Sequence, residues 1–232
     1  MLALKATRLT KTYKKSKHPA LDSLDLDVGS RQIFTMLGRN GAGKTTLLRC
    51  LGGLSRPTCG TVRWLGQPAA ASPCGKRLVG MASHETCVYP HLTARENLLF
   101  AARMYDLRDP AQHVGRWLSA VGLASHADRL AAQFSQGMRQ RLALARALVH
   151  QPRIVLLDEP FAGLDTEAAA WLVDLLNELR VGRSAVCLAT HDRPWAETIS
   201  ARVVRLESGR LVECAADDRK SGLPSVPLLH AR

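Results

Sequence analysis

The sequence predicts an α/β core with a helical segment inserted in its middle. Near both ends of the chain, short apolar runs typical of strands alternate with helical patterns, whereas residues from about Thr93 to Leu130 have helical periodicity throughout. Such alternation is typical of a parallel sheet covered by helices. The third observation is a glycine-rich segment, residues 38–45, between a predicted strand and a predicted helix, where phosphate-binding loops occur.

The first part of the chain predicts strands followed by one helix. LKATRLTKTY and ALDSLDLDVGSRQIFTMLG hold their apolar residues in short runs, which favours strands. From Gly43 the text GKTTLLRCLGGL places Leu47, Leu48 and Leu51 on one face of a helix that ends near residues 52–53. TVRWLG is expected to form a strand followed by a turn.

The rest of the chain predicts helices and then further strands. ARENLLFAARMY and HVGRWLSAVGL are expected to be helices, and a third helix is expected through MRQRLALARALV. RIVLLD is a continuous apolar run, typical of a strand buried on both faces of a parallel sheet. EAAAWLVDLLNELR predicts a helix, and SAVCLAT and RVVRLESGRLV predict strands. We expect one domain over residues 1–215, a helical subdomain over about 92–150, and a loosely ordered tail over 216–232.

Composition narrows the possible environments. The net charge of +12 suits an anionic partner such as nucleic acid, nucleotide or a membrane surface, and equally suits a solvated basic surface, because the basic residues are scattered. The six cysteines form no C-x-x-C pair, so they are expected to be reduced, mostly buried thiols of a cytosolic protein. No run of about 18 apolar residues and no signal-peptide core are present, so we expect a protein that is soluble or held at a membrane by a partner.

Residues 38–45, GRNGAGKT, match G-x-x-x-x-G-K-[ST] at every fixed position. The glycines allow backbone amides to turn inward around phosphates, and the following helix adds its positive N-terminal end. Lys44 is expected to reach the β- and γ-phosphates of ATP, and the Thr45 hydroxyl to take a position on Mg²⁺. The expected nucleotide-binding residues of this segment are Gly38, Arg39, Asn40, Gly41, Ala42, Gly43, Lys44, Thr45 and Thr46.

Two acidic residues, Asp158 and Glu159, stand at the end of a predicted buried strand, directly after the apolar residues IVLL. Asp158 ends this strand, where its carboxylate can hold magnesium directly or through water. Glu159 follows at the exposed edge, in position to act as general base for an attacking water. Because the pair comes after four apolar residues in a chain with a phosphate loop, a catalytic role is favoured over a solvated loop.

FSQGMRQRLALARAL, residues 134–148, resembles the signature sequence of ABC ATPases, which is usually written LSGGQ. Its distance from LLDEP also agrees, and LTARENL, LLDEPFAGLD and ATHD extend the similarity over nearly the whole chain. The chain is identified as a member of this family. The resemblance implies a phosphate-loop NTPase core with an inserted helical signature subdomain, ATP hydrolysis coupled to transport, ATP and Mg²⁺ as cofactors, and Tyr13 stacked on adenine.

In this family two subunits bind head to tail with two ATP molecules between them, so the resemblance implies a second copy of this chain as a partner. Asp165 would line the dimer interface, and His191 would sense the γ-phosphate and help to hold the water activated by Glu159. The γ-phosphate of the other subunit's ATP would be capped by Ser135, Gln136 and Gly137, at a helix N-terminus that favours an anion. Gln136 stands where the family form has Gly.

The segment MASHETCVYPHLTAREN has His84 where most ABC ATPases have glutamine, in the loop that reaches magnesium and contacts the membrane subunit. Imidazole prefers softer ions than magnesium, so we expect His84 to couple the two subunits. With FSQGM and the small size, this pattern resembles the ATPase subunit of the cytochrome c maturation haem exporter. That resemblance implies haem export through a separate transmembrane permease subunit, with this chain cytoplasmic and peripheral on the inner face of the cell membrane.

Two alternatives stay open. ATPase subunits of drug, polysaccharide and lipid exporters share SQGM and LTARENL, and such a subunit does not itself bind the cargo. Some soluble ABC ATPases work in translation or DNA repair without a membrane partner. Those proteins usually carry two ATPase units or a long coiled-coil insertion, whereas this sequence has one unit and a short helical insertion. We therefore expect no nucleic-acid partner.

Overall fold

Two β-sheets form the framework of the molecule. The computed structural model describes residues 1–14, 16–69, 74–83, 87–200 and 202–213. The smaller sheet is antiparallel, with strand order β2-β1-β4-β5. Its strands are β1 (Leu2–Lys11), β2 (Leu21–Gly29), β4 (Cys59–Trp64) and β5 (Gln67–Pro68).

The larger sheet has six strands in the order β10-β9-β3-β8-β7-β6. All neighbours pair in parallel except β9 and β10, which form an antiparallel hairpin. The strands are β3 (Ile33–Leu37), β6 (Val79–Ala82), β7 (Ile154–Asp158), β8 (Ala185–Thr190), β9 (Arg202–Glu207) and β10 (Arg210–Glu213). Parallel strands bring their carboxyl ends to one edge of a sheet, which is where ligands bind in α/β folds.

The larger sheet is buried on both faces. Successive residues of a strand point to opposite sides, and in β7 Leu156 belongs to the core on one side while Val155 and Leu157 belong to the core on the other. Every residue of β3, β7 and β8 is buried. This confirms the prediction that the apolar run RIVLLD forms a strand buried on both faces of a parallel sheet.

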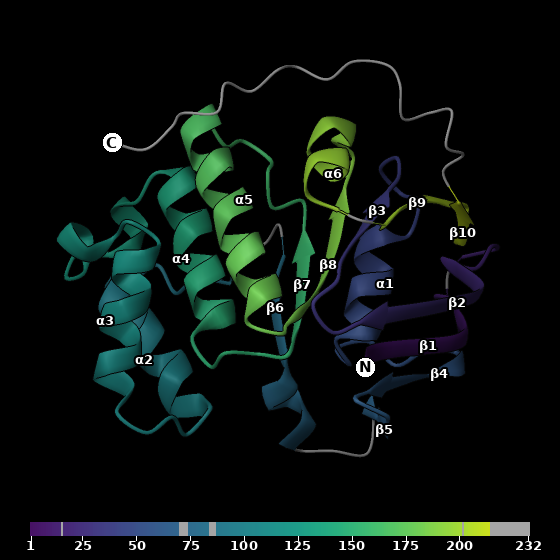
Figure 1. Ribbon diagram of the computed structural model, residues 1–232, viewed down its shortest axis with the longest axis horizontal. Coiled ribbons are helices and arrows are strands. Elements are labelled where there is room, and N and C mark those ends of the chain that lie inside the picture. The colour runs from purple at the N-terminus through teal and green to yellow at the C-terminus, as the bar shows by residue number, and fades with distance from the viewer. Residues whose placement is uncertain (15, 70–73, 84–86, 201, 214–232) are drawn as a thin grey trace.

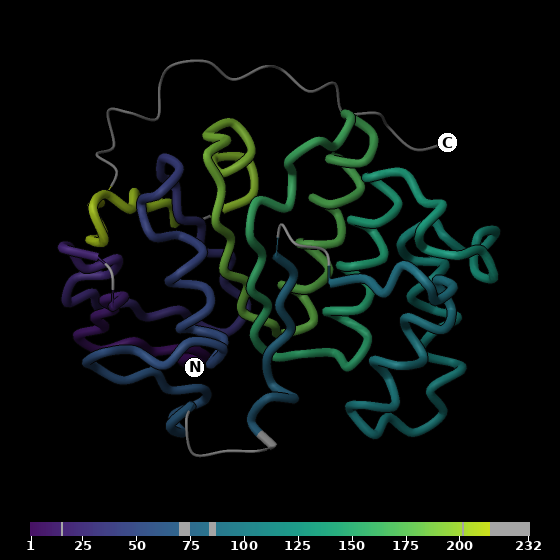
Figure 2. The backbone as a smooth tube through the Cα atoms, turned by 180° about the vertical axis from the view of Figure 1, so that it is seen from behind, coloured from purple at the N-terminus to yellow at the C-terminus, as the bar shows by residue number. Residues whose placement is uncertain are grey.

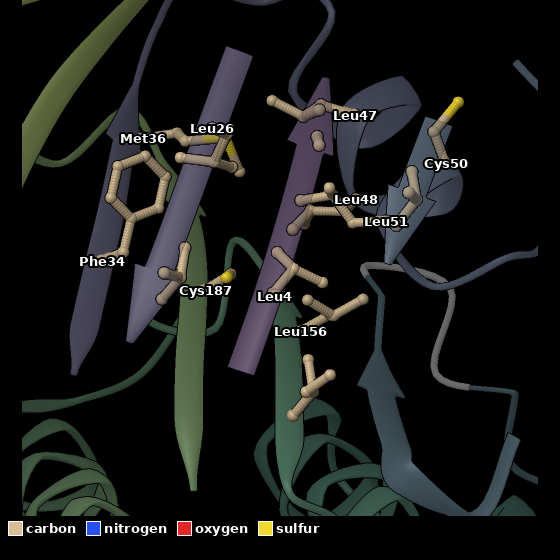
Figure 3. Packing of buried hydrophobic residues seen from close by; sticks show 14 of the residues in the cluster. Leu4, Leu26, Phe34, Met36, Leu47, Leu48, Cys50, Leu51, Leu156 and Cys187 are labelled. Carbon is tan, nitrogen blue, oxygen red and sulfur yellow. The ribbon is translucent and has the colours of Figure 1, made fainter. Parts of the chain in front are cut away.

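Helix α1 (Lys44–Leu51) packs between the two sheets (Figure 3). Its predicted apolar face is buried, since Leu47, Leu48 and Leu51 have no exposed area and join Leu4 of β1 in one cluster. The indole N–H of Trp64 donates to the Leu51 carbonyl at 2.8 Å. The smaller sheet thus packs against α1, the helix that follows the phosphate loop.

The predicted helical subdomain lies at the opposite end of the molecule from the smaller sheet (Figures 1 and 2). Helix α4 is shared, because Leu142 packs into the helical cluster while Leu144 and Leu148 pack against the larger sheet. The subdomain contains α2 (Ala94–Met104), α3 (Pro110–Ala120), the 3₁₀ turns η3 (Ala124–His126) and η4 (Ala131–Gln133), and α4 (Gln136–Leu148). Two further helices, α5 (Thr166–Val181) and α6 (Arg193–Ile199), cover the sheet face next to α4.

The structure confirms the α/β fold class and each helix and strand predicted from the sequence. It adds β5, β6, α6 and the 3₁₀ turn η2 (Cys74–Leu78), which are too short to show clear periodicity. Of the four cysteines whose burial is described, Cys50 and Cys187 are buried as expected, whereas Cys59, at the start of β4, and Cys87, in a loop, are exposed. Burial raises the pKa of the Cys187 thiol to about 12.

No helix within the described residues has the combination of length and hydropathy that a membrane span requires. The predicted tail, residues 216–232, lies outside the described residues.

Candidate functional site

The phosphate loop runs from the end of β3 to the start of α1, as predicted. Gly43 caps the helix with φ +106°, and a Cβ there would clash with the Ala20 carbonyl oxygen. A Cβ on Gly38 would lie 2.8 Å from the Leu206 carbonyl oxygen. Only glycine fits at both positions, so the loop backbone is packed tightly against β9 and against the residue that precedes β2.

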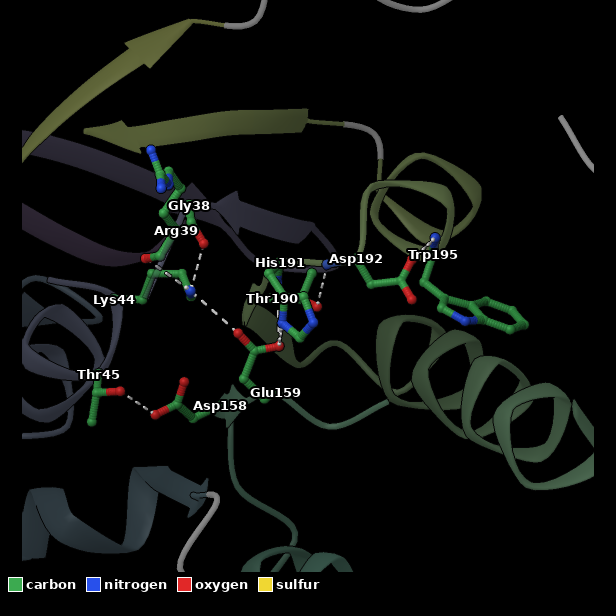
Figure 4. A network of polar contacts seen from close by, with 10 residues as sticks. All are labelled: Gly38, Arg39, Lys44, Thr45, Asp158, Glu159, Thr190, His191, Asp192 and Trp195. Atoms are coloured by element: carbon green, nitrogen blue, oxygen red, sulfur yellow. Dashed lines mark hydrogen bonds and ion pairs between the residues drawn. The ribbon is translucent and has the colours of Figure 1, made fainter. Parts of the chain in front are cut away.

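Lys44 is the centre of the polar network at this loop (Figure 4). Its ammonium group donates to the Gly38 carbonyl at 2.6 Å and forms an ion pair with Glu159 Oε1 at 3.2 Å. The side chain of Lys44 is 7% exposed and that of Glu159 is 16% exposed. Lys44 therefore links the phosphate loop directly to the predicted general base, a contact that the sequence pattern did not reveal.

Thr45 and Asp158 meet beside this pair. The Thr45 hydroxyl donates to Asp158 Oδ2 at 2.6 Å, although the two residues are 113 positions apart. Asp158 is the last residue of β7 and is 5% exposed. A hydroxyl and a carboxylate are hard oxygen ligands of the kind that Mg²⁺ uses together with phosphate oxygens. The described residues contain no group of three or more His, Cys, Asp or Glu that could hold a metal by itself.

Glu159 and His191 are also in contact. Glu159 Oε2 accepts the backbone N–H of His191 at 3.2 Å and lies 2.9 Å from His191 Nδ1. Because a carboxylate only accepts, Nδ1 carries the proton in this contact. Glu159 has φ +50° and its N–H donates to the Ala189 carbonyl of β8 at 2.8 Å. The ends of β3, β7 and β8 thus bring three predicted site residues together.

Tyr13 lies beside the start of α1. Its hydroxyl is 3.3 Å from Thr46 Oγ1, and Lys11 Nζ is 5.2 Å from the centre of its ring. The residue is 44% exposed. An exposed aromatic ring next to a phosphate loop can stack on a base, so stacking of Tyr13 on adenine stays a prediction.

Replacing Tyr13 by alanine should raise the dissociation constant for ATP severalfold, because a stacked aromatic pair contributes on the order of 1 kcal/mol. Tyr13→Phe is the matched control, since it keeps the ring and loses only the contact with Thr46. Equilibrium titration with a fluorescent ATP analogue would measure both. Unchanged affinity in both variants would remove Tyr13 from the nucleotide site.

Two of the predicted signature residues, Ser135 and Gly137, lie around a second pocket. Ser135 caps α4 by accepting the Met138 N–H at 3.3 Å, and Asp165 caps α5 by accepting the Ala168 N–H at 2.8 Å. Ser135, Gly137 and Asp165 line one pocket of about 280 Å³. Gln136 does not line this pocket. Its side chain lies near Gly163, where an added Cβ would be 3.7 Å from Gln136 Nε2.

A groove of about 670 Å³ lies between β6 and the helical subdomain. Exposed apolar side chains line it, and its basic residues are Lys76, Arg77 and Arg146. The exposed apolar residues are Leu54, Tyr89, Phe100 and Met104. Ser83 and Cys87 of the groove flank residues 84–86, so the predicted coupling residue His84 belongs to this region of the sequence but lies outside the described residues.

Sequence reasoning missed two contacts of the segment that follows Glu159. The Phe161 ring stacks on the Trp195 ring, and the Gln140 side chain donates to the Pro160 carbonyl at 3.3 Å. Phe161 and Trp195 are 34 positions apart, and the helix that carries Trp195, α6, was not predicted. The sequence offered one signal for this contact, which is the aromatic residue directly after LLDEP.

Comparison with known proteins identifies the family. A family model described as ABC transporter matches residues 21–162. The sulfate/thiosulfate import ATP-binding protein CysA of Rhodopseudomonas palustris is 37% identical over 221 residues, which cover 91% of this chain and 63% of that protein. The spermidine/putrescine import ATP-binding protein PotA 1 of Pseudomonas aeruginosa is 35% identical over 217 residues, which cover 90% of this chain and 59% of that protein. The chain thus spans less than two thirds of the length of these relatives.

Solved structures agree with this result. A structure described as the ATP-binding subunit of an ABC transporter has a TM-score of 0.85 at 28% identity and covers 93% of this chain, which covers 91% of that chain. A dimeric ATP-binding cassette in a post-hydrolysis state with ADP and Pi has a TM-score of 0.83 at 28% identity, with 90% and 96% covered. The family model matches more than half of the sequence, and the chain therefore belongs to the ABC transporter family, with the fold of its ATP-binding cassette.

Proposed function

We propose that this chain binds and hydrolyses ATP to power transport through a separate transmembrane permease subunit. The observation that carries the proposal is the Lys44–Glu159–His191 network at the carboxyl ends of β3, β7 and β8. It unites a phosphate-binding lysine, a carboxylate base and a histidine in one site. Residues 1–215 would form the ATP-binding domain, with about 92–150 as its helical subdomain.

Each residue of the network has a defined task in this proposal. The phosphate loop and Lys44 hold the β- and γ-phosphates, and Glu159 accepts a proton from the attacking water. The Nδ1–H of His191 donates a hydrogen bond to the Glu159 carboxylate at 2.9 Å and so fixes the position of that carboxylate. The side chain of His191 is 65% exposed, so the other edge of the imidazole can reach the γ-phosphate. Transfer of the lysine from Glu159 to the phosphates would release one carboxylate oxygen for the water.

The Thr45 hydroxyl and the Asp158 carboxylate fit a magnesium ion, because both are oxygen ligands and they lie 2.6 Å apart. When bound there, the ion would supply positive charge to the β- and γ-phosphate oxygens. Asp158, buried at the end of β7, would hold the position of the metal relative to the phosphate loop.

A second copy of the chain would complete the site. Ser135 and Gly137 lie at the N-terminus of α4, where backbone amides favour an anion, and they share their pocket with Asp165. The structurally similar cassette that holds ADP and Pi is a dimer. We propose that this pocket caps the γ-phosphate of the partner's ATP and that Asp165 lies at the interface.

The groove between β6 and α2 would receive the permease subunit. Its exposed apolar side chains suit an apolar segment, and its basic residues suit a carboxylate on that segment. His84, in the sequence between Ser83 and Cys87 of the groove wall, would couple the permease to the ATP site. In this proposal the chain is peripheral on the cytoplasmic face of the membrane.

Two cargoes have support of different kinds. The motif with His84 and FSQGM resembles haem exporters of cytochrome c maturation, whereas two relatives are named as import proteins, one for sulfate/thiosulfate and one for spermidine/putrescine. The matched segments cover 63% and 59% of the lengths of these two proteins. We propose haem export because one part of the resemblance, the segment with His84, belongs to the region of the sequence that would contact the permease, and import is the second candidate.

The decisive experiment is purification of the chain from detergent-solubilised membranes, identification of the co-purifying permease, and measurement of ATP hydrolysis with and without it. We expect His84→Ala to keep basal hydrolysis and lose stimulation by the permease, and His84→Gln to restore part of the stimulation, because stimulation depends on contacts that differ between two states of the loop. A basal rate that falls and is rescued by excess magnesium would assign His84 to the metal. Absence of a membrane subunit would overturn the transport proposal.

A further inference from the structure

His191 is an exposed residue in the short connection between β8 and α6. It follows β8 directly, and its side chain is 65% exposed. Helix α6 begins two residues later and contains seven residues. A helix of this length is unstable in water by itself. The strand β8 holds His191 on one side, and on the other side its position depends on how α6 packs against the rest of the molecule.

The Trp195 side chain provides a direct link from α6 to the segment that carries Glu159. Its ring stacks on the Phe161 ring with a centroid distance of 5.1 Å and an interplanar angle of 3°. Phe161 is 7% exposed and follows Glu159 by two residues. The backbone N–H of Trp195 donates to Asp192 Oδ1 at 3.3 Å, which ties the first turn of α6 to the residue that follows His191 (Figure 4).

Glu159 itself has supports that do not involve Trp195. Its N–H donates to the Ala189 carbonyl, its Oε1 pairs with Lys44, and the adjacent Pro160 carbonyl accepts from Gln140 of α4. Loss of the Trp195 ring should therefore displace α6 and His191 while leaving the carboxylate of Glu159 in place.

From this geometry we infer that Trp195 is a positioning residue for ATP hydrolysis: its stack on Phe161 holds α6 so that His191 stays on Glu159. The inference rests on the proposed function, because it assigns a task to a neighbour of the proposed catalytic pair. The ring acts through His191 and has no contact of its own to the phosphate loop in the described hydrogen bonds and ring contacts.

The test is a double-mutant cycle on the full chain, with kcat and KM for ATP measured at saturating magnesium. Trp195→Ala should lower kcat about tenfold and change KM less than about twofold, because it disturbs a catalytic contact and not the phosphate loop. Trp195→Phe should recover at least about half of the wild-type kcat, since it can still stack on Phe161. In a His191→Ala background, Trp195→Ala should have less than about a twofold further effect.

Matched controls separate positioning from general packing. Trp117→Ala removes a partly buried tryptophan of α3 that packs against the same core cluster, and it should lower the melting temperature without lowering kcat. If the Trp195→Ala variant does not fold, Trp195→Leu replaces it in the test, because leucine fills part of the space but cannot stack on Phe161. Equal losses of kcat in the wild-type and His191→Ala backgrounds, or no loss in either Trp195 variant, would overturn the inference. A His191→Ala variant with wild-type kcat would instead overturn the proposed role of His191.

Discussion

The Glu159→Gln variant is expected to lose ATP hydrolysis by about a hundredfold or more while still binding ATP. A positioned general base contributes roughly 10²–10⁴-fold to a reaction rate, and the amide cannot accept the water's proton. The phosphate loop and Lys44 remain, so the nucleotide is still held. Binding should even strengthen, because Lys44 no longer has to leave a carboxylate at 3.2 Å before it contacts the phosphates.

Lys44→Ala is the matched contrast, since it removes the other partner of the same ion pair. It should weaken binding of ATP and ADP by more than about tenfold, because charge-assisted contacts to phosphate are among the stronger hydrogen bonds in proteins. Turnover and equilibrium binding of both nucleotides should be measured side by side. Near-normal turnover in Glu159→Gln would exclude this residue as the base, and normal binding in Lys44→Ala would exclude the lysine from the phosphate site.

Ser135→Arg is expected to abolish hydrolysis without damaging the phosphate loop of its own chain. Ser135 lies in the pocket shared with Gly137 and Asp165, and the proposed head-to-tail dimer brings that pocket to the partner's ATP. Ser135→Arg and Lys44→Ala should therefore complement each other. An equal mixture should regain about a quarter of the wild-type rate, because half of randomly formed dimers are mixed and each keeps one complete site.

The control for complementation is the sum of the two variants measured separately, which should be close to zero. Sedimentation of Glu159→Gln with ATP and no magnesium should show the shift from monomer to dimer. An inactive mixture together with a wild-type specific rate that does not change with protein concentration would contradict the shared site. Such a chain would hydrolyse ATP as a monomer.

Local sequence determined most of the phosphate loop and the main elements. The glycines at 38 and 43 were predicted from the motif, and the structure gives the reason: a Cβ at either position would meet backbone oxygen. The helix after Gly43 and the strand before Glu159 were predicted because their apolar patterns are strong and uninterrupted. The short elements β6 and α6 were not, because four to seven residues carry too little periodicity.

The assembly of the candidate site depended on the tertiary structure. The sequence by itself determined which residue types were present and in what order, including Lys44, Glu159 and His191. Only the folded sheet decided that the lysine pairs with Glu159, and that His191 holds the other carboxylate oxygen. The physical reason is that hydrogen bonds and ion pairs act over a few ångströms, and the order β3-β8-β7 brings together strand ends at Leu37, Asp158 and Thr190 that are far apart in the chain.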